Sequence, residues 1–98
     1  MNAFFDELAE RFVRAAGRRG AAVQAPALEP AVAQEILELA RVAAHTQERR
    51  FAPLASFMAG VAAERLRRSG GPSSADAVAE LIREVRNELE EAHPPAAV

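Results

Sequence analysis

The stretch ARVAAHTQERRFAPLASFMAG, residues 40–60, decides the fold of this chain. Its first part continues an apolar helical pattern, a short charged segment interrupts that pattern, and a proline then opens a second apolar run. Proline suits the first turn of a helix, because its missing N–H group has no helical partner there. We therefore predict two helices joined by a turn, the first from Pro30 to about Gln47 and the second opening at Pro53.

The helix predicted to open at Pro53 carries no charged residue from Leu54 to Ala63, so we expect it to be the most buried element. Helical spacing gives it two different faces. One face is bulky, and we expect its Phe57 to lie in the core of the monomer. The bulky face comprises Leu54, Phe57, Met58 and Val61, and the small face comprises Ser56, Ala59, Gly60 and Ala63.

The small face is the candidate interface. Small residues spaced four apart let another helix approach closely, and two partners remain open: the preceding helix of the same chain, or a second copy of the chain. A glycine inside a helix is unfavourable by about 1 kcal/mol relative to alanine, so Gly60 indicates a close backbone neighbour. The interface candidates are Ser56, Ala59, Gly60 and Ala63.

Two further helices are predicted around this pair. The first follows Asn2 and ends at the glycines at positions 17 and 20. The last is capped by Ser73 or Ser74 and ends near residue 92, before a tail at residues 93–98 that we expect to be disordered. The chain is thus predicted to be an all-α four-helix bundle, a single domain of residues 1–92, with the second and third helices central.

Composition predicts a thin core. Half of the 98 residues are hydrophobic, but 24 of these are alanine, which buries little surface. A domain of this length buries only roughly two thirds of its unfolded surface, so apolar surface from a second copy would help it. We therefore expect a homodimer.

Charge and residue usage exclude several classes of function. The net charge is −2 and all twelve basic residues are arginine, without the basic stripe typical of nucleic-acid binding proteins. The absence of cysteine excludes disulfides and thiolate metal sites. Acidic residues within the first fifteen positions argue against a signal peptide, and no apolar run reaches the roughly 18 residues of a membrane span. These features predict a cytoplasmic protein without a membrane or nucleic-acid partner.

The charged segment of residues 45–50 contains the candidate ligand-binding residues His45, Glu48, Arg49 and Arg50. One hypothesis is a solvated polar face with local ion pairs. A second is a small-anion pocket of His45, Arg49 and Arg50, to which the free N–H groups of the next helix could add. A third places His45 against another helix with a hydrogen bond.

The sequence predicts no catalytic residue, metal or cofactor. The second histidine, His93, lies in the expected tail, so a metal site lacks ligands. No serine has a histidine at a suggestive spacing, and no glycine-rich phosphate loop is present. Although an acid–base pair among the fourteen carboxylates stays open, none stands out, and we expect a non-enzymatic protein.

Residues 36–63, ILELARVAAHTQERRFAPLASFMAGVAA, resemble a small actinobacterial family of unknown function. Members of that family show a pattern like LL-LAR-VAH-VER-APL-TF-AG-AA, and occur alone or appended to molybdenum-cofactor guanylyltransferases. The resemblance implies an accessory module, with a link to molybdenum-cofactor metabolism, and gives no active site to transfer. We expect a homodimeric interaction module; the alternative is a protein that binds a small anion or nucleotide near His45, Arg49 and Arg50.

Overall fold

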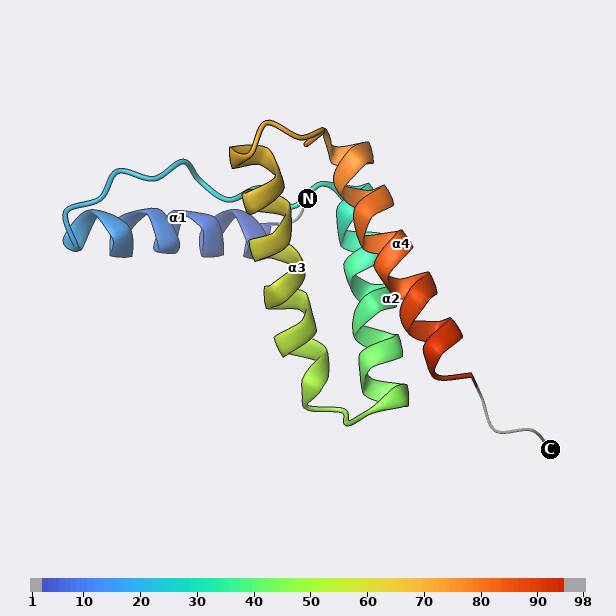
Figure 1. Ribbon diagram of the computed structural model, residues 1–98. Helices are drawn as coiled ribbons and strands as arrows, with labels where there is room; N and C mark the ends of the chain where they lie inside the picture. Colours follow the sequence, from blue (N-terminus) through green and yellow to red (C-terminus); the bar gives the residue numbers. More distant parts are fainter. Residues whose placement is uncertain (1–2, 95–98) are drawn as a thin grey trace. The chain divides into compact units, whose positions relative to one another are not determined.

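The computed structural model describes residues 3–94 of the chain, and within that range it contains four helices and no strand. The helices are α1 (Ala3–Arg18), α2 (Pro30–Thr46), α3 (Phe51–Arg68) and α4 (Ala75–Ala92), shown in Figure 1. The prediction of an all-α protein with four helices is confirmed. The chain forms two compact units, residues 1–30 and residues 31–98, so a single domain and a bundle of all four helices stay predictions.

The first unit consists of α1 and the segment that follows it. Gly20 ends the helical path with a positive φ of 79°, and the N–H of Ala21 donates to the carbonyl of Ala16 at 3.0 Å. Such a left-handed glycine is a common helix terminator, because it has no Cβ to clash. The segment then returns beside α1, and residues 25–30 line a shallow depression together with Leu8 and Phe12. None of the residues of α1 is buried.

The turn between α2 and α3 differs slightly from the prediction. Helix α3 begins at Phe51, two residues before Pro53. The N–H of Phe51 donates to the carbonyl of Glu48 at 3.0 Å, and the N–H of Ala52 to that of Arg49 at 3.2 Å. Pro53 is therefore the third residue of the helix and not its first. It still lies in the first turn, so its missing N–H costs no helical hydrogen bond.

Two adjacent glycines hold the turn between α3 and α4. Gly70 has a positive φ of 84°, and the N–H of Gly71 donates to the carbonyl of Leu66 at 3.0 Å. A Cβ on Gly71 would overlap the side chain of Leu66, so a larger residue here would require that side chain to move. Of the two predicted caps, Ser74 is the one used: its hydroxyl oxygen accepts from the N–H of Ala77 at 3.1 Å.

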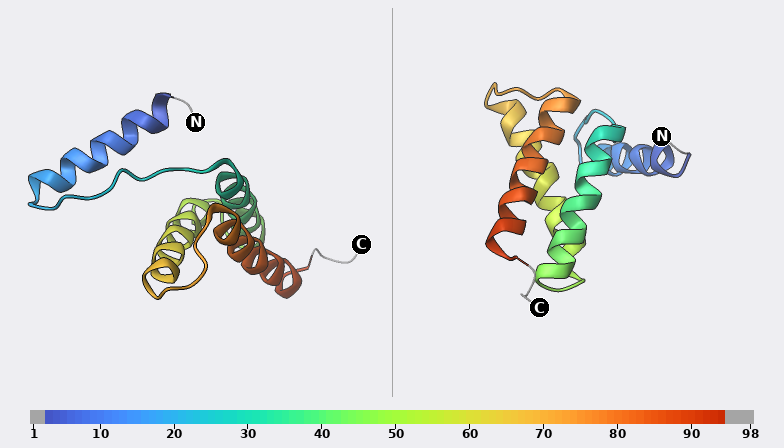
Figure 2. Two further views of the ribbon diagram at one scale, coloured as in Figure 1. Left: turned by 90° about the horizontal axis from the view of Figure 1, so that it is seen from above. Right: turned by 90° about the vertical axis from the view of Figure 1, so that its right-hand side faces the viewer.

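Helices α2, α3 and α4 share one small core, and Figure 2 shows the ribbons of these three helices from two further directions. Its centre is made by one residue from each helix, Leu39, Ala59 and Ile82, which are 7%, 8% and 3% exposed. Val42 of α2 is the most buried residue, at 2%. Helices α2 and α3 thus both enter the core, as predicted, and α2 supplies most of its buried residues.

The burial predicted for α3 is wrong. Ala59 is its only buried residue, whereas Leu54, Phe57 and Met58 are 60%, 74% and 71% exposed. The helix turns its alanines toward α2 and α4, because small side chains let the helices approach closely, and it turns its bulky side chains outward. Phe57 consequently lies outside the monomer core.

A buried ion pair joins α2 to α4. Glu35 is 6% exposed, and its Oε2 accepts from Nε of Arg83 at 3.0 Å. Its other oxygen, Oε1, is 3.6 Å from Nη2 of Arg86. The other terminal nitrogen of Arg86, Nη1, donates a hydrogen bond to Glu90 at 2.8 Å. The two arginines offset the cost of removing the Glu35 carboxylate from water. The burial of Glu35 was not predicted from the sequence.

Candidate functional site

The predicted anion-binding residues do not form a common pocket. Glu48 and Arg50 pair with each other at 3.3 Å, and the guanidinium of Arg50 also lies 5.9 Å from the ring centre of Phe51. His45 and Arg49 are exposed, and within residues 3–94 neither takes part in an ion pair. The arrangement fits the hypothesis of a solvated polar face with local ion pairs. The hypothesis that His45 is buried against another helix is wrong.

His45 lies instead at the end of α2 that adjoins the end of α4. There it lines a shallow depression of about 350 Å³ with Arg41, Thr46, Glu90 and His93. His93 occupies the C-cap position of α4, and its N–H donates to the carbonyl of Leu89 at 3.1 Å. Residues 95–98 of the expected disordered tail lie outside the described residues. Arg49 and Arg50 do not line this depression, so it is not the anion pocket that the sequence suggested.

Inorganic phosphate or a nucleotide is therefore expected to leave the melting temperature unchanged at millimolar concentration. Binding at one hundred times the dissociation constant would stabilise the fold by about 2.7 kcal/mol, which is easily measured by thermal melting. A rise in wild-type melting temperature that the Arg49→Ala variant loses would support the anion pocket of His45, Arg49 and Arg50.

A continuous apolar surface covers the solvent side of α3. We call it the outer face of α3 and define it as Leu54, Phe57, Met58 and Val61. Three of these side chains are at least 60% exposed, and Val61 is partly exposed. Scattered apolar residues are normal on a protein surface, but a contiguous group of this size on one helix indicates an interaction site.

The four small residues predicted as an interface divide between the inside and the outside of α3. Ala59 is buried in the core, and Ser56 and Ala63 are partly buried. Gly60 is exposed next to the outer face, and a Cβ built on it would have no atom within 4 Å. No neighbour within residues 31–94 therefore explains a glycine at this position, and the backbone of a partner stays a predicted reason.

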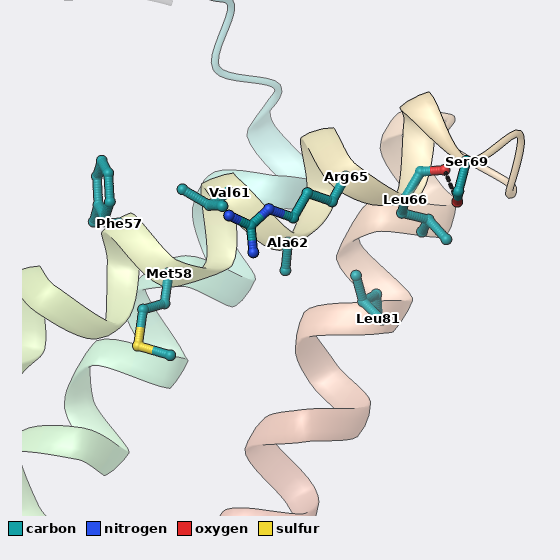
Figure 3. Close-up of a pocket in the computed structure, with 8 residues that line it drawn as sticks. All are labelled: Phe57, Met58, Val61, Ala62, Arg65, Leu66, Ser69 and Leu81. Atoms are coloured by element: carbon teal, nitrogen blue, oxygen red, sulfur yellow. Dashed lines mark hydrogen bonds between the residues drawn. The ribbon is translucent and has the colours of Figure 1, made fainter.

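Figure 3 shows how the outer face continues into a groove beside α4. Phe57 and Val61 project from α3, and the side chain of Arg65 folds back along the helix toward Val61. Leu66 and Leu81 face each other between α3 and α4 and form the floor. The groove has a volume of about 600 Å³ and is mostly apolar, which suits a helix or an extended segment better than a polar small molecule.

Charged residues border the outer face at its C-terminal end. Arg67 donates to Glu64 at 2.9 Å, and this hydrogen bond, with the charges of Arg67 and Arg68, holds the pKa of Glu64 below its usual value. Arg65 lines the groove and takes part in no ion pair of residues 3–94. An apolar centre with a charged rim that contains arginine is the usual composition of a protein–protein interface.

The chain matches one protein family along almost its whole length. The family is described as a domain of unknown function, DUF6457, and the match covers residues 1–97. The chain belongs to the DUF6457 family. No curated protein and no solved structure shows a significant match to it. The predicted resemblance to a family of unknown function is confirmed at this level.

Two features are absent from the described part of the DUF6457 domain: a cluster of metal ligands and a membrane-spanning helix. Among residues 3–94, no three histidine, aspartate or glutamate side chains are grouped so that they could hold a metal ion. None of the helices in this range is both long and apolar enough to cross a bilayer. The outer face of α3 is thus the feature of this domain that most clearly indicates binding.

Proposed function

We propose that this DUF6457 domain is a homodimeric interaction module and that the outer face of α3 is its interface. One observation supports the proposal above all: α3 turns alanine toward the core and Phe57 toward solvent. Exposing such a face costs free energy in water, and burying it against a partner recovers that free energy. The exposed Gly60 beside it would let the backbone of a partner helix approach.

The size of the outer face fits a small interface. Complete burial of a large apolar side chain contributes about 1.5–3 kcal/mol. At about 25 cal/mol per Å² of buried apolar surface, this free energy corresponds to roughly 60–120 Å² for each side chain. Four such residues from each of two copies give roughly 500–1,000 Å², close to the lower limit of about 1,000 Å² for a specific interface.

Light scattering after size-exclusion chromatography tests the proposal. The wild type is expected at twice its chain mass of 10.5 kDa, and Phe57→Glu at the mass of one chain, because the new carboxylate would be buried without a partner. The matched control is Leu37→Glu, since Leu37 is also a highly exposed apolar residue, at 70%, but lies on α2. That variant is expected to remain a dimer with an unchanged circular dichroism spectrum.

A wild type that is monomeric at high micromolar concentration would contradict the homodimer. The interface would be misplaced if Phe57→Glu stayed dimeric, or if Leu37→Glu became monomeric while remaining folded.

We further propose molybdenum-cofactor metabolism as the setting of the domain. The support is the sequence resemblance of residues 36–63 to a family whose members also occur fused to molybdenum-cofactor guanylyltransferases. A module that dimerises through an exposed helix face could join two such enzymes without itself catalysing a reaction. In this proposal the domain binds no cofactor and acts only through its protein contacts.

A further inference from the structure

A second apolar helix face in this chain is also only partly covered. In α1, Leu8 and Phe12 lie one turn apart and are 38% and 58% exposed, and none of the residues of α1 is buried. A single helix of 16 residues is marginally stable in water, so most of its stability has to come from packing of its apolar side. Residues 25–30 line a shallow depression with these two side chains but leave them partly exposed, so a partner has apolar surface of α1 left to cover.

The apolar faces of α1 and α3 match in size. The two helices have 16 and 18 residues, which corresponds to lengths of about 24 and 27 Å. The groove along α3, lined by Phe57, Val61 and Leu81, is the kind of site that accepts the apolar side of an amphipathic helix. The surface area buried by two outer faces alone reaches only the lower limit for a specific interface. The apolar sides of two α1 helices would add a comparable buried area, which brings the total to the size of a standard interface.

Charge selects one orientation of α1 on α3. The charged residues in the first half of α1 are Asp6, Glu7 and Glu10, whereas the charged residues in its second half are all arginine. Helix α3 is uncharged through Ala63 and predominantly basic from residue 64 to residue 68. Antiparallel packing places the acidic half of α1 beside Arg65 and Arg68, whereas parallel packing would place arginine beside arginine.

The segment that connects α1 to the rest of the chain is long enough for an exchange between copies. It contains eleven residues, 19–29, all but one of them exposed. Eleven extended residues span up to about 36–40 Å, more than the length of α3. A reciprocal exchange of one helix between identical chains gives two equal contacts and closed twofold symmetry.

From these observations we infer that α1 of each copy packs antiparallel on the outer face of α3 of a second copy, so that the dimer is formed by exchanged helices. The inference rests on the proposed function, because it assumes that the outer face of α3 is an interface. It adds the identity of the segment that binds there.

Complementation between two variants tests the exchange. Phe12→Glu disables α1, and Phe57→Glu disables the outer face of α3; each variant alone is expected to be monomeric by light scattering. An equimolar mixture still offers one intact α1 and one intact outer face, so a heterodimer of one chain of each kind is expected. The control Arg14→Glu, on the polar side of α1, places the same carboxylate away from the contact and is expected to remain dimeric.

Each alternative gives a different result. A mixture that stays monomeric would overturn the exchange and indicate that each α1 packs within its own chain. A dimeric Phe12→Glu beside a monomeric Phe57→Glu would also overturn it, but would leave the proposed α3 interface standing. If both variants stayed dimeric, the proposed function itself would be wrong.

Charge reversal tests the antiparallel orientation. Asp6 and Arg65 take part in no ion pair of the described residues, so reversing either one breaks no ion pair within that part of the chain. Asp6→Arg and Arg65→Asp are each expected to weaken dimerisation by about two- to fivefold, the range of an exposed ion pair, and the double variant to restore it. Failure of the double variant to recover would contradict the antiparallel placement.

Discussion

Replacement of Glu35 by alanine is expected to lower the free energy of unfolding by about 1–3 kcal/mol. The reason is the charge that the substitution leaves behind. The side chain of Arg86 is only 18% exposed, and its contacts are Glu35 at 3.6 Å and Glu90 at 2.8 Å. Without Glu35 this partly buried guanidinium keeps only its pair with Glu90, and the half-exposed Arg83 loses its link to α2. Urea unfolding followed by circular dichroism measures the loss.

Glu38 supplies the control for this substitution. It lies on the same helix, is 37% exposed at its side chain, and pairs with Arg41 at 3.0 Å one turn away. An exposed pair of this kind contributes a few tenths of a kcal/mol, so Glu38→Ala is expected to cost less than about 0.5 kcal/mol. Equal losses for the two variants would show that the contact between α2 and α4 does not depend on the buried ion pair.

The positions of the helices follow from short-range signals that the sequence displays. Glycines end α1 and α3, proline falls within the first turn of α2 and of α3, and Ser74 caps α4. Each of these signals acts through the backbone of its own neighbourhood, so no knowledge of the tertiary structure is needed. The start of α3 was predicted two residues late because proline is accepted anywhere in the first turn, not only at its first position.

Which face of α3 turns inward could not be predicted in the same way. A helical pattern separates Phe57 from Ala59, but it does not say which of the two meets the other helices. The preference of bulky apolar residues for the interior favoured Phe57. In the structure, Leu39 and Ile82 supply the large side chains at the centre of the core, and α3 meets them with the small Ala59.

The buried carboxylate was missed for a related reason. Charged residues are almost never fully buried unless they are paired, so the residue type of Glu35 gives no reason to expect it in the core. Its spacing was nevertheless informative, since it precedes Leu39 by four residues and Val42 by seven, and both are buried on the same side of α2. The partner arginines lie 48 and 51 positions further along the chain, beyond the reach of any local pattern.

Ile82→Ala is the second substitution with a large expected effect, and comparison with Phe57→Ala separates the core from the interface. Ile82 is 3% exposed between Leu39 and Ala59, so its truncation leaves a cavity and is expected to cost about 2–5 kcal/mol. Phe57 is 74% exposed in the monomer, and its truncation there is expected to cost less than about 1 kcal/mol.

Protein concentration distinguishes the two losses. A cavity in the monomer lowers the free energy of unfolding equally at every concentration, whereas a weakened dimer interface matters only where the wild type is dimeric. Urea unfolding across a hundredfold range of concentration should therefore show a constant loss for Ile82→Ala and a loss that grows with concentration for Phe57→Ala. A large, concentration-independent loss for Phe57→Ala would mean that this ring is buried within a single chain. Should Ile82→Ala prove too unstable to measure, Ile82→Val, with an expected cost of about 0.5–1.5 kcal/mol, gives the same comparison on a smaller scale.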